Sequence, residues 1–162
     1  MAITFGVVAV LVLCMYGFWR SQRVNTLAME ASQLSEEEEA LQSLFSRRFQ
    51  VAGELAARSG DAELQSILSV PMTSEAEVSD LYVKSDQRLA ALQRELAKNG
   101  KLEELRELFT QLSAIEDEIV ARYATYQSQR ERYQRRLSQG DLKRGARRFP
   151  DWEIGASLSA RP

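Results

Sequence analysis

Hydrophobic residues recur at intervals of three and four positions through most of the chain. No stretch alternates apolar and polar residues as a half-buried strand would. Only three prolines occur among the 162 residues, so long helical segments are not interrupted. The pattern therefore predicts an all-α fold built from a few long helices.

The ends of four helices are marked by local signals. Ser35 and Ser74 are each followed three positions later by a glutamate, which is the capping-box pattern of a helix start. Gly60 and Gly100 stand where a residue in the left-handed conformation commonly ends a helix. The signals predict helices over residues 35–58, 61–70, 74–98 and 102–137.

The last predicted helix carries the most regular apolar seam. Its inward positions include an aromatic group made of Tyr123, Tyr126 and Tyr133. The same register places two charged residues, Glu116 and Arg130, on the seam. Because the seam is sustained over about five heptads, packing against other helices is expected. The predicted architecture is an antiparallel helical bundle of three to four helices.

Residues 3–19 form a run of about 17 residues without a charge, near the lower length limit for crossing a bilayer. Tyr16 and Trp19 stand at its end, where amphipathic rings favour lipid headgroups, and Arg20 and Arg23 follow. The run predicts a single transmembrane helix. Since Lys and Arg favour the cytoplasmic side, we expect the N-terminus outside and the bundle inside the cell.

A cleaved signal peptide is the competing explanation for this run. It requires basic residues before the apolar stretch and a small-residue cleavage site after it. Here no basic residue precedes the run, and bulky aromatics and arginines follow it. The favoured prediction is an uncleaved anchor with its basic flank (residues 1–23), a cytosolic bundle (residues 24–139) and a basic, flexible tail (residues 140–162).

The composition excludes several kinds of catalytic site. The sequence has no histidine, and its single cysteine, Cys14, lies inside the apolar run. An internal disulfide, a Cys/His metal site and a histidine-activated nucleophile are therefore impossible. No glycine-rich phosphate loop is present. We expect no catalytic residues, no metal ligands and no cofactor, and we interpret the protein as a non-enzyme.

A spaced motif runs through the last helix. Its positions are Glu116, Ile119, Arg122, Tyr126-Gln127 and Tyr133-Gln134. A second stretch, Leu41–Leu55, carries the paired arginines Arg47 and Arg48. Together these stretches resemble the signatures of the LemA family, which are bacterial single-pass proteins with a cytosolic four-helix bundle. The resemblance implies an inner-membrane protein that acts through contacts with other proteins.

The chain also departs from the family pattern. Gln127 and Gln134 stand where the family has asparagine, and Gly53-Glu54 stands where it has Pro-Asn. A similarity shared by unrelated helical bundles is the alternative explanation.

Glu116 is a charged residue at an inward position of the seam. An ionised carboxylate there is costly unless it is paired, and breaking such a pair typically costs about 3–5 kcal/mol. Arg47 and Arg48 are its candidate partners, because a neighbouring antiparallel helix can bring them alongside. Arg122 is six positions away on the same helix and lies far round the cylinder. A buried ion pair that fixes helix register is one hypothesis, and a solvated Glu116 is the other.

The tyrosines of the seam also allow two interpretations. Their rings bury a large apolar area while their hydroxyls reach polar groups at the rim of a bundle. Ordinary core residues are favoured over a pair of aromatic residues that contact a ligand.

The region from Arg122 to Arg148 contains nine Lys or Arg residues against two acids. Its most basic part includes Lys143, Arg144, Arg147 and Arg148, followed by Phe149 and Trp152. Such a segment suits an anionic membrane surface. RNA is a less favoured partner because no recognisable RNA-binding module is present. A solvated tail or a docking segment for a protein partner is an equal alternative.

Three function classes remain. The leading hypothesis is a membrane-anchored structural or adaptor protein whose partners are the lipid bilayer and other membrane or cytosolic proteins, self-association included. The second is a non-catalytic accessory subunit of a larger bacterial membrane complex. An enzyme is the weakest, because the usual catalytic groups are missing.

Overall fold

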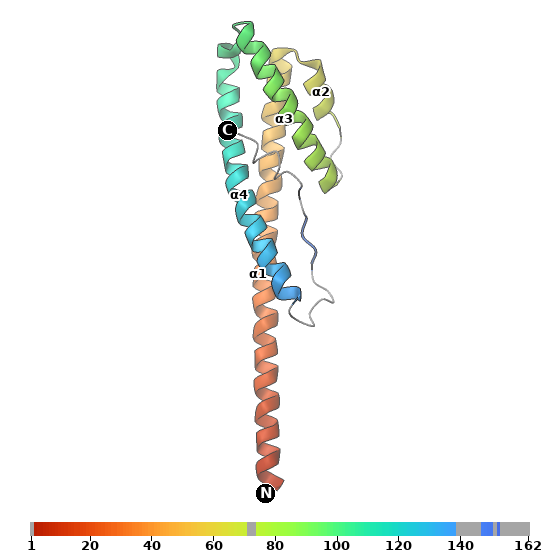
Figure 1. Ribbon diagram of the computed structural model, residues 1–162, viewed down its shortest axis with the longest axis vertical. Coiled ribbons are helices and arrows are strands. Elements are labelled where there is room, and N and C mark those ends of the chain that lie inside the picture. The colour runs from red at the N-terminus through yellow and green to blue at the C-terminus, as the bar shows by residue number, and fades with distance from the viewer. Residues whose placement is uncertain (1, 71–73, 139–146, 151, 153–162) are drawn as a thin grey trace. The chain divides into compact units, whose positions relative to one another are not determined.

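A computed structural model of the chain describes residues 2–70, 74–138, 147–150 and 152 (Figure 1), with side chains from residue 11 onward except that of Glu75. Its elements are α1 (Ala2–Ser59), α2 (Ala62–Leu68), α3 (Glu75–Lys98), the 3-10 turn η1 (Leu102–Leu105) and α4 (Arg106–Ser138). These ranges contain helices and no strand, so the predicted all-α fold is confirmed.

Two helices end close to glycines with positive φ, as the local signals predict. Gly60 has φ 73° and Gly100 has φ 67°, a region where a Cβ atom is strained. The start of α3 is a capping box, as predicted: the Ser74 hydroxyl accepts from the Glu77 N–H at 3.3 Å, and the Glu77 carboxylate accepts from the Ser74 N–H at 2.8 Å. These ends are confirmed.

The helix start predicted at Ser35 is wrong, because α1 continues through this residue from Ala2 to Ser59. No glycine or proline stands between Trp19 and Ser35, so nothing breaks the preceding helix. A capping box acts only where the chain enters a helix, and Ser35 instead lies inside one. Its hydroxyl accepts a hydrogen bond from Arg147 Nη1 at 3.0 Å.

The N-terminal part of α1 was predicted to cross a membrane. Within the described part of the chain, none of the helices combines the length and the apolar character that a membrane crossing requires. The predicted span starts at Ile3, and the side chains of residues 1–10 lie outside the described ones.

The chain divides into two compact units. The first unit contains Met1–Glu37 and Tyr126–Phe149, and the second contains Glu38–Thr125 and Pro150–Pro162. This division does not follow the predicted boundaries at residues 23 and 139, because both of them lie inside the first unit.

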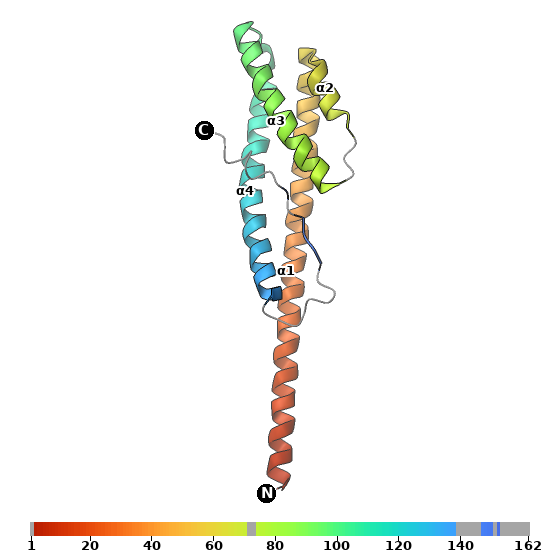
Figure 2. The same cartoon turned by 45° about the vertical axis from the view of Figure 1, so that its right-hand side comes forward.

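The second unit holds the larger apolar core. In it, α2 and α3 lie beside the C-terminal part of α1, and α4 runs in the opposite direction to α1 (Figures 1 and 2). Burying each large aliphatic side chain stabilises the fold by about 1.5–3 kcal/mol relative to leaving it in water. One cluster of this core contains Ala52, Leu55, Ala56, Leu64, Leu89, Leu92, Leu96, Leu105, Leu108 and Leu112.

The first unit has a smaller core with aromatic residues. Leu34 on α1 and the tyrosines at 126 and 133 on α4 are buried, as is Phe149 from the segment after α4. The rings of Tyr133 and Phe149 meet edge to face, with centroids 5.5 Å apart.

Part of the predicted flexible tail is packed. Phe149, Pro150 and Trp152 are buried, and the Trp152 ring lies 5.6 Å from that of Phe45 in the second unit. For these residues the prediction of a flexible tail is wrong, because large rings gain more from burial than from exposure. Residues 140–146, 151 and 153–162, with Lys143 and Arg144 among them, lie outside the described residues.

Candidate functional site

A buried arginine joins three helices of the second unit. Arg48 on α1 is fully buried, and its Nε donates to Glu116 Oε1 on α4 at 3.1 Å. Its Nη1 donates to Ser85 Oγ on α3 at 2.7 Å, and its Nη2 lies 3.4 Å from Asp86 Oδ1. The guanidinium carbon is 4.1 Å from the centre of the Tyr82 ring. We call this group the Arg48 cluster.

The surroundings of Arg48 explain why a charge is tolerated in this core. Glu116 supplies a nearly buried carboxylate and Asp86 a half-buried one, while the Tyr82 ring presents its negative face. The Ser85 hydroxyl accepts from Arg48 and donates to the Tyr82 carbonyl at 3.0 Å. A buried guanidinium needs this number of acceptors to offset the loss of water. The arrangement is suited to fixing the register of three helices.

Of the two arginines predicted as partners of Glu116, the structure brings only Arg48 to it. Arg47 is exposed. Arg122 pairs instead with Glu118 on its own helix at 3.5 Å, one turn away. The sequence could not choose between Arg47 and Arg48, because adjacent positions on a helix differ by about 100° around its axis.

A second ion pair holds the corner between α1 and α2. Asp61 caps α2 by accepting from the Leu64 N–H at 2.8 Å, and its other oxygen lies 2.6 Å from Arg88 Nη2 on α3. Burial acts to raise the pKa of Asp61, but the hydrogen bonds from Arg88 and Leu64 outweigh it and hold that pKa below its usual range. The sequence predicts a helix that begins at residue 61, but it does not reveal the pair with Arg88.

The tyrosines of the α4 seam are buried to different degrees. Tyr126 and Tyr133 are buried, while Tyr123 is half-buried and its hydroxyl donates to the carbonyl oxygen of Trp152 at 2.5 Å. Burial raises the pKa of Tyr133, and the negative charge of Glu30 adds to the effect. These positions agree with a role in core packing.

The first unit contains a hollow of about 410 Å³, which sequence reasoning did not find. Its lining includes the aromatic pair of Tyr133 and Phe149 and three arginines. The described lining residues are Arg130, Tyr133, Gln134, Leu137, Ser138, Arg147, Arg148 and Phe149, and none of them is acidic. We call it the arginine hollow. In the sequence, its one sign is an aromatic residue, Phe149, directly after Arg147 and Arg148.

The two described arginines of the predicted basic tail both line this hollow. Arg147 and Arg148 are exposed. The guanidinium of Arg147 lies 5.2 Å from the ring centre of Phe149 and donates to the Ser35 hydroxyl. These contacts place at least Arg147 in a defined position at the rim.

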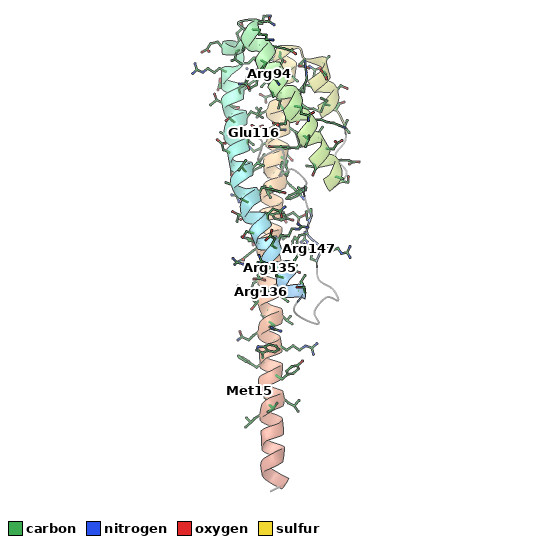
Figure 3. All side chains as sticks on the ribbon, in the orientation of Figure 1. Met15, Arg94, Glu116, Arg135, Arg136 and Arg147 are labelled. Atoms are coloured by element: carbon green, nitrogen blue, oxygen red, sulfur yellow. The ribbon has the colours of Figure 1, made fainter. Side chains whose placement is uncertain are left out.

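The part of α1 from Leu11 to Trp19 is exposed to an unusual degree. Met15, labelled in Figure 3, is 72% exposed, and no large hydrophobic side chain in this stretch is less than half exposed. The rings of Tyr16 and Trp19 lie 6.3 Å apart, and the Arg23 guanidinium stacks 4.0 Å from the Trp19 ring. Arg20 is exposed, and so is the thiol of Cys14.

None of these features has the composition of a catalytic centre. Among the described residues, no group of three or more Asp, Glu, Cys or His side chains could hold a metal ion. Glu116, the most buried carboxylate of the seam, faces the guanidinium of Arg48. This pair joins α1 to α4 inside the second unit.

No protein family, curated protein or solved structure matches this chain.

Proposed function

We propose that the protein is a membrane-anchored helical-bundle adaptor that acts through contacts with other proteins. The observation that carries the proposal is the exposed apolar surface of α1. Its residues are Leu11, Val12, Leu13, Met15, Tyr16, Phe18 and Trp19, each 52–72% exposed.

Soluble monomeric proteins rarely expose so many neighbouring apolar side chains, and such surfaces commonly mark a membrane or protein interaction site. Each of these side chains gains about 1.5–3 kcal/mol on transfer to an apolar surrounding. They point to several sides of the helix, which suits lipid better than a single partner surface. The sequence extends the same run without a charge back to Ile3.

The end of the exposed surface has the composition of a membrane interface. Tyr16 and Trp19 are followed by Arg20 and Arg23, and the stacking of Arg23 on Trp19 joins a cation to an amphipathic ring. The two arginines favour a cytoplasmic location for the part of the chain that follows. We place the anchor in the bacterial inner membrane, with the N-terminus outside.

The family resemblance supports the same role. The motif residues Glu116 and Tyr126 are buried, as expected if a LemA-type signature encodes helix packing. We propose the chain as a divergent LemA-like protein on this ground. The resemblance supplies no reaction, and the proposed role is accordingly non-catalytic.

An accessory subunit of a larger membrane complex is the second candidate, favoured by the same exposed surface if other membrane helices cover it. The adaptor should fold cooperatively when purified alone in detergent, whereas an obligate subunit should not. Crosslinking in native membranes followed by identification of the captured proteins would then define the partners.

Flotation of the full-length chain with lipid vesicles tests the anchor. We expect the wild-type chain to float with vesicles and the double variant Leu13→Arg/Phe18→Arg to remain in the dense fraction. Each arginine opposes insertion by about 2.5–3.5 kcal/mol at the centre of a membrane helix. The matched control is Val120→Arg on α4, also an exposed apolar residue, which should float like the wild type. Equal loss in both variants, or a wild type that stays with the dense fraction, would contradict the proposal.

A further inference from the structure

We infer that the arginine hollow binds the phosphate group of an anionic phospholipid at the membrane surface. The inference rests on the proposed membrane anchor and assigns a ligand to a site beyond it. Three features carry it: the position of the hollow along α1, its charge, and the chemistry of its lining.

The hollow lies close to the predicted membrane interface. Arg136, two residues from the end of α4, pairs with Glu30 on α1 at 2.8 Å, so this end of α4 is level with Glu30. Only seven residues separate Glu30 from Arg23, the last residue of the predicted anchor. At 1.5 Å per residue this separation is about 10 Å, roughly one Debye length at 0.1 M salt. A charge at the hollow is therefore within electrostatic reach of lipid headgroups.

The charged side chains among the described lining of the hollow are all positive. They are three arginines, and none of the described lining residues carries a carboxylate. Two acids of the first unit, Glu30 and Glu131, are paired with Arg136 and Arg135. Figure 3 shows Arg135, Arg136 and Arg147 at the same end of α4. Arg135 and Arg136 balance these two acids, so the positive charge at this end comes from the arginines that line the hollow. An anion is the ligand that this field attracts.

The lining is also suited to a phosphate diester on an apolar body. Guanidinium groups bind phosphate oxygens through two parallel N–H bonds, and the Ser138 hydroxyl can donate a further bond. Arg147 is held by Ser35 and by the ring of Phe149, so part of the rim is ordered in advance. Leu137 and the Tyr133–Phe149 pair provide apolar contact for the glycerol and the first methylenes of a lipid.

The test compares binding of the full-length chain to two kinds of vesicle, phosphatidylcholine alone and phosphatidylcholine with phosphatidylglycerol. Binding to the first measures the anchor by itself. Binding to the second should be stronger, and the double variant Arg147→Gln/Arg148→Gln should lose about 30-fold of it, or about fivefold for each arginine. Its binding to phosphatidylcholine alone should not change.

Three further arms decide whether the hollow itself is responsible. Arg94→Gln/Lys101→Gln removes the same charge from exposed residues outside the hollow and should bind anionic vesicles like the wild type. Arg147→Lys/Arg148→Lys keeps the charge but loses the bidentate geometry, and it should bind several-fold more weakly. The single variant Arg148→Gln serves if the double variant fails to fold. Binding by the lysine variant equal to wild type would show diffuse surface attraction and overturn the inference.

The result also separates the inference from the proposal on which it rests. A wild type that binds both vesicles equally contradicts the phospholipid site and leaves the anchor intact. A wild type that binds neither contradicts both. If soluble glycerol 3-phosphate binds as tightly as anionic vesicles do, the ligand is a free metabolite, and the assignment to lipid is wrong.

Discussion

Arg48 and Arg148 are the same residue type in opposite settings. Arg48 is fully buried in the second unit and has a carboxylate, a hydroxyl, a second carboxylate and an aromatic face around its guanidinium. Arg148 is exposed in the first unit and lines a hollow whose described lining residues include no acid. Acidic, hydroxyl and aromatic groups of the same chain surround the charge of Arg48, while the charge of Arg148 faces solvent.

The difference separates a charge that stabilises the fold from a charge that is available for the proposed lipid binding. A buried arginine without its acceptors would destabilise the fold, so the Arg48 cluster must be complete before any partner arrives. An arginine that stays in water contributes little to the free energy of folding, and its guanidinium can still bind a ligand. Arg88 lies between the two, with a side chain that is 20% exposed and paired with the buried Asp61.

The largest expected effect is at the Arg48 cluster. Arg48→Met should lower the free energy of unfolding by about 3–5 kcal/mol, because it leaves the carboxylate of Glu116 buried without its main partner. Urea denaturation of the purified chain measures the change. The neighbouring Arg47→Met is the matched control and should shift the free energy by less than about 0.5 kcal/mol.

The double variant Arg48→Met/Glu116→Leu sharpens this prediction. Replacing both charges with apolar groups removes the uncompensated carboxylate, so part of the lost stability should return. Equal destabilisation by Arg47→Met and Arg48→Met, with no recovery in the double variant, would show that the cluster does not hold the fold.

The apolar side of the arginine hollow should behave as core even though its rim faces water. Phe149→Ala removes a buried ring that packs on Tyr133, and we expect a loss of about 3 kcal/mol in unfolding free energy. Phe18→Ala, at an exposed position of α1, should change it by less than about 0.5 kcal/mol in detergent. If Phe149→Ala leaves the unfolding free energy unchanged, the segment after α4 is solvated and the hollow is not a formed site.

The pair of Asp61 and Arg88 should have an intermediate, pH-dependent effect on stability. Asp61→Asn preserves a good N-cap and removes the charge facing Arg88, which should cost about 1 kcal/mol at neutral pH. The folded pKa of Asp61 lies below its unfolded value of about 3.9, so the unfolded chain takes up the proton first as pH falls. The contribution is complete above that unfolded value and disappears as pH falls through the folded pKa.

Thermal unfolding of both proteins from pH 7 to pH 3 measures this effect. The gap between wild type and Asp61→Asn should be constant at the upper end and close below about pH 4. Asp80→Asn, in an exposed pair with Lys84, should show little gap at any pH. A gap that is independent of pH would exclude the charge of Asp61 as its cause.

The smallest expected effect on stability is at the rim of the hollow. Arg148→Gln should change the unfolding free energy by less than about 0.5 kcal/mol, because the exposed side chain gives up little on folding. A loss above about 1 kcal/mol in chemical denaturation would assign Arg148 a structural role like that of Arg48 and remove the distinction drawn above.

The sequence predicts local structure in this chain better than it predicts sites. The stops at Gly60 and Gly100 and the capping box at Ser74 were readable because each signal acts within a few residues. Glu116 could be singled out because a charge interrupts an apolar seam. Its partner, Arg48, could not be identified without knowing which face of α1 turns inward, and that depends on packing against two other helices.

The errors have the same origin. Ser35 carries a valid helix-start signal, but the helix before it never ends, and a local pattern cannot reveal that. The arginine hollow joins residues of α4 to a segment beyond it across an interval that composition suggested was solvated. The burial of Phe149 depends on the position of Tyr133, so no local pattern around Phe149 predicts it.

The exposed thiol of Cys14 offers a direct view of the surroundings of α1. Because the chain has no other cysteine, an environment-sensitive dye attached there would label one turn of this helix and nothing else. Its emission would shift to shorter wavelength in hydrocarbon and remain at longer wavelength in water. The protein thus contains its own reporter for the depth of its N-terminal helix, without any engineered residue.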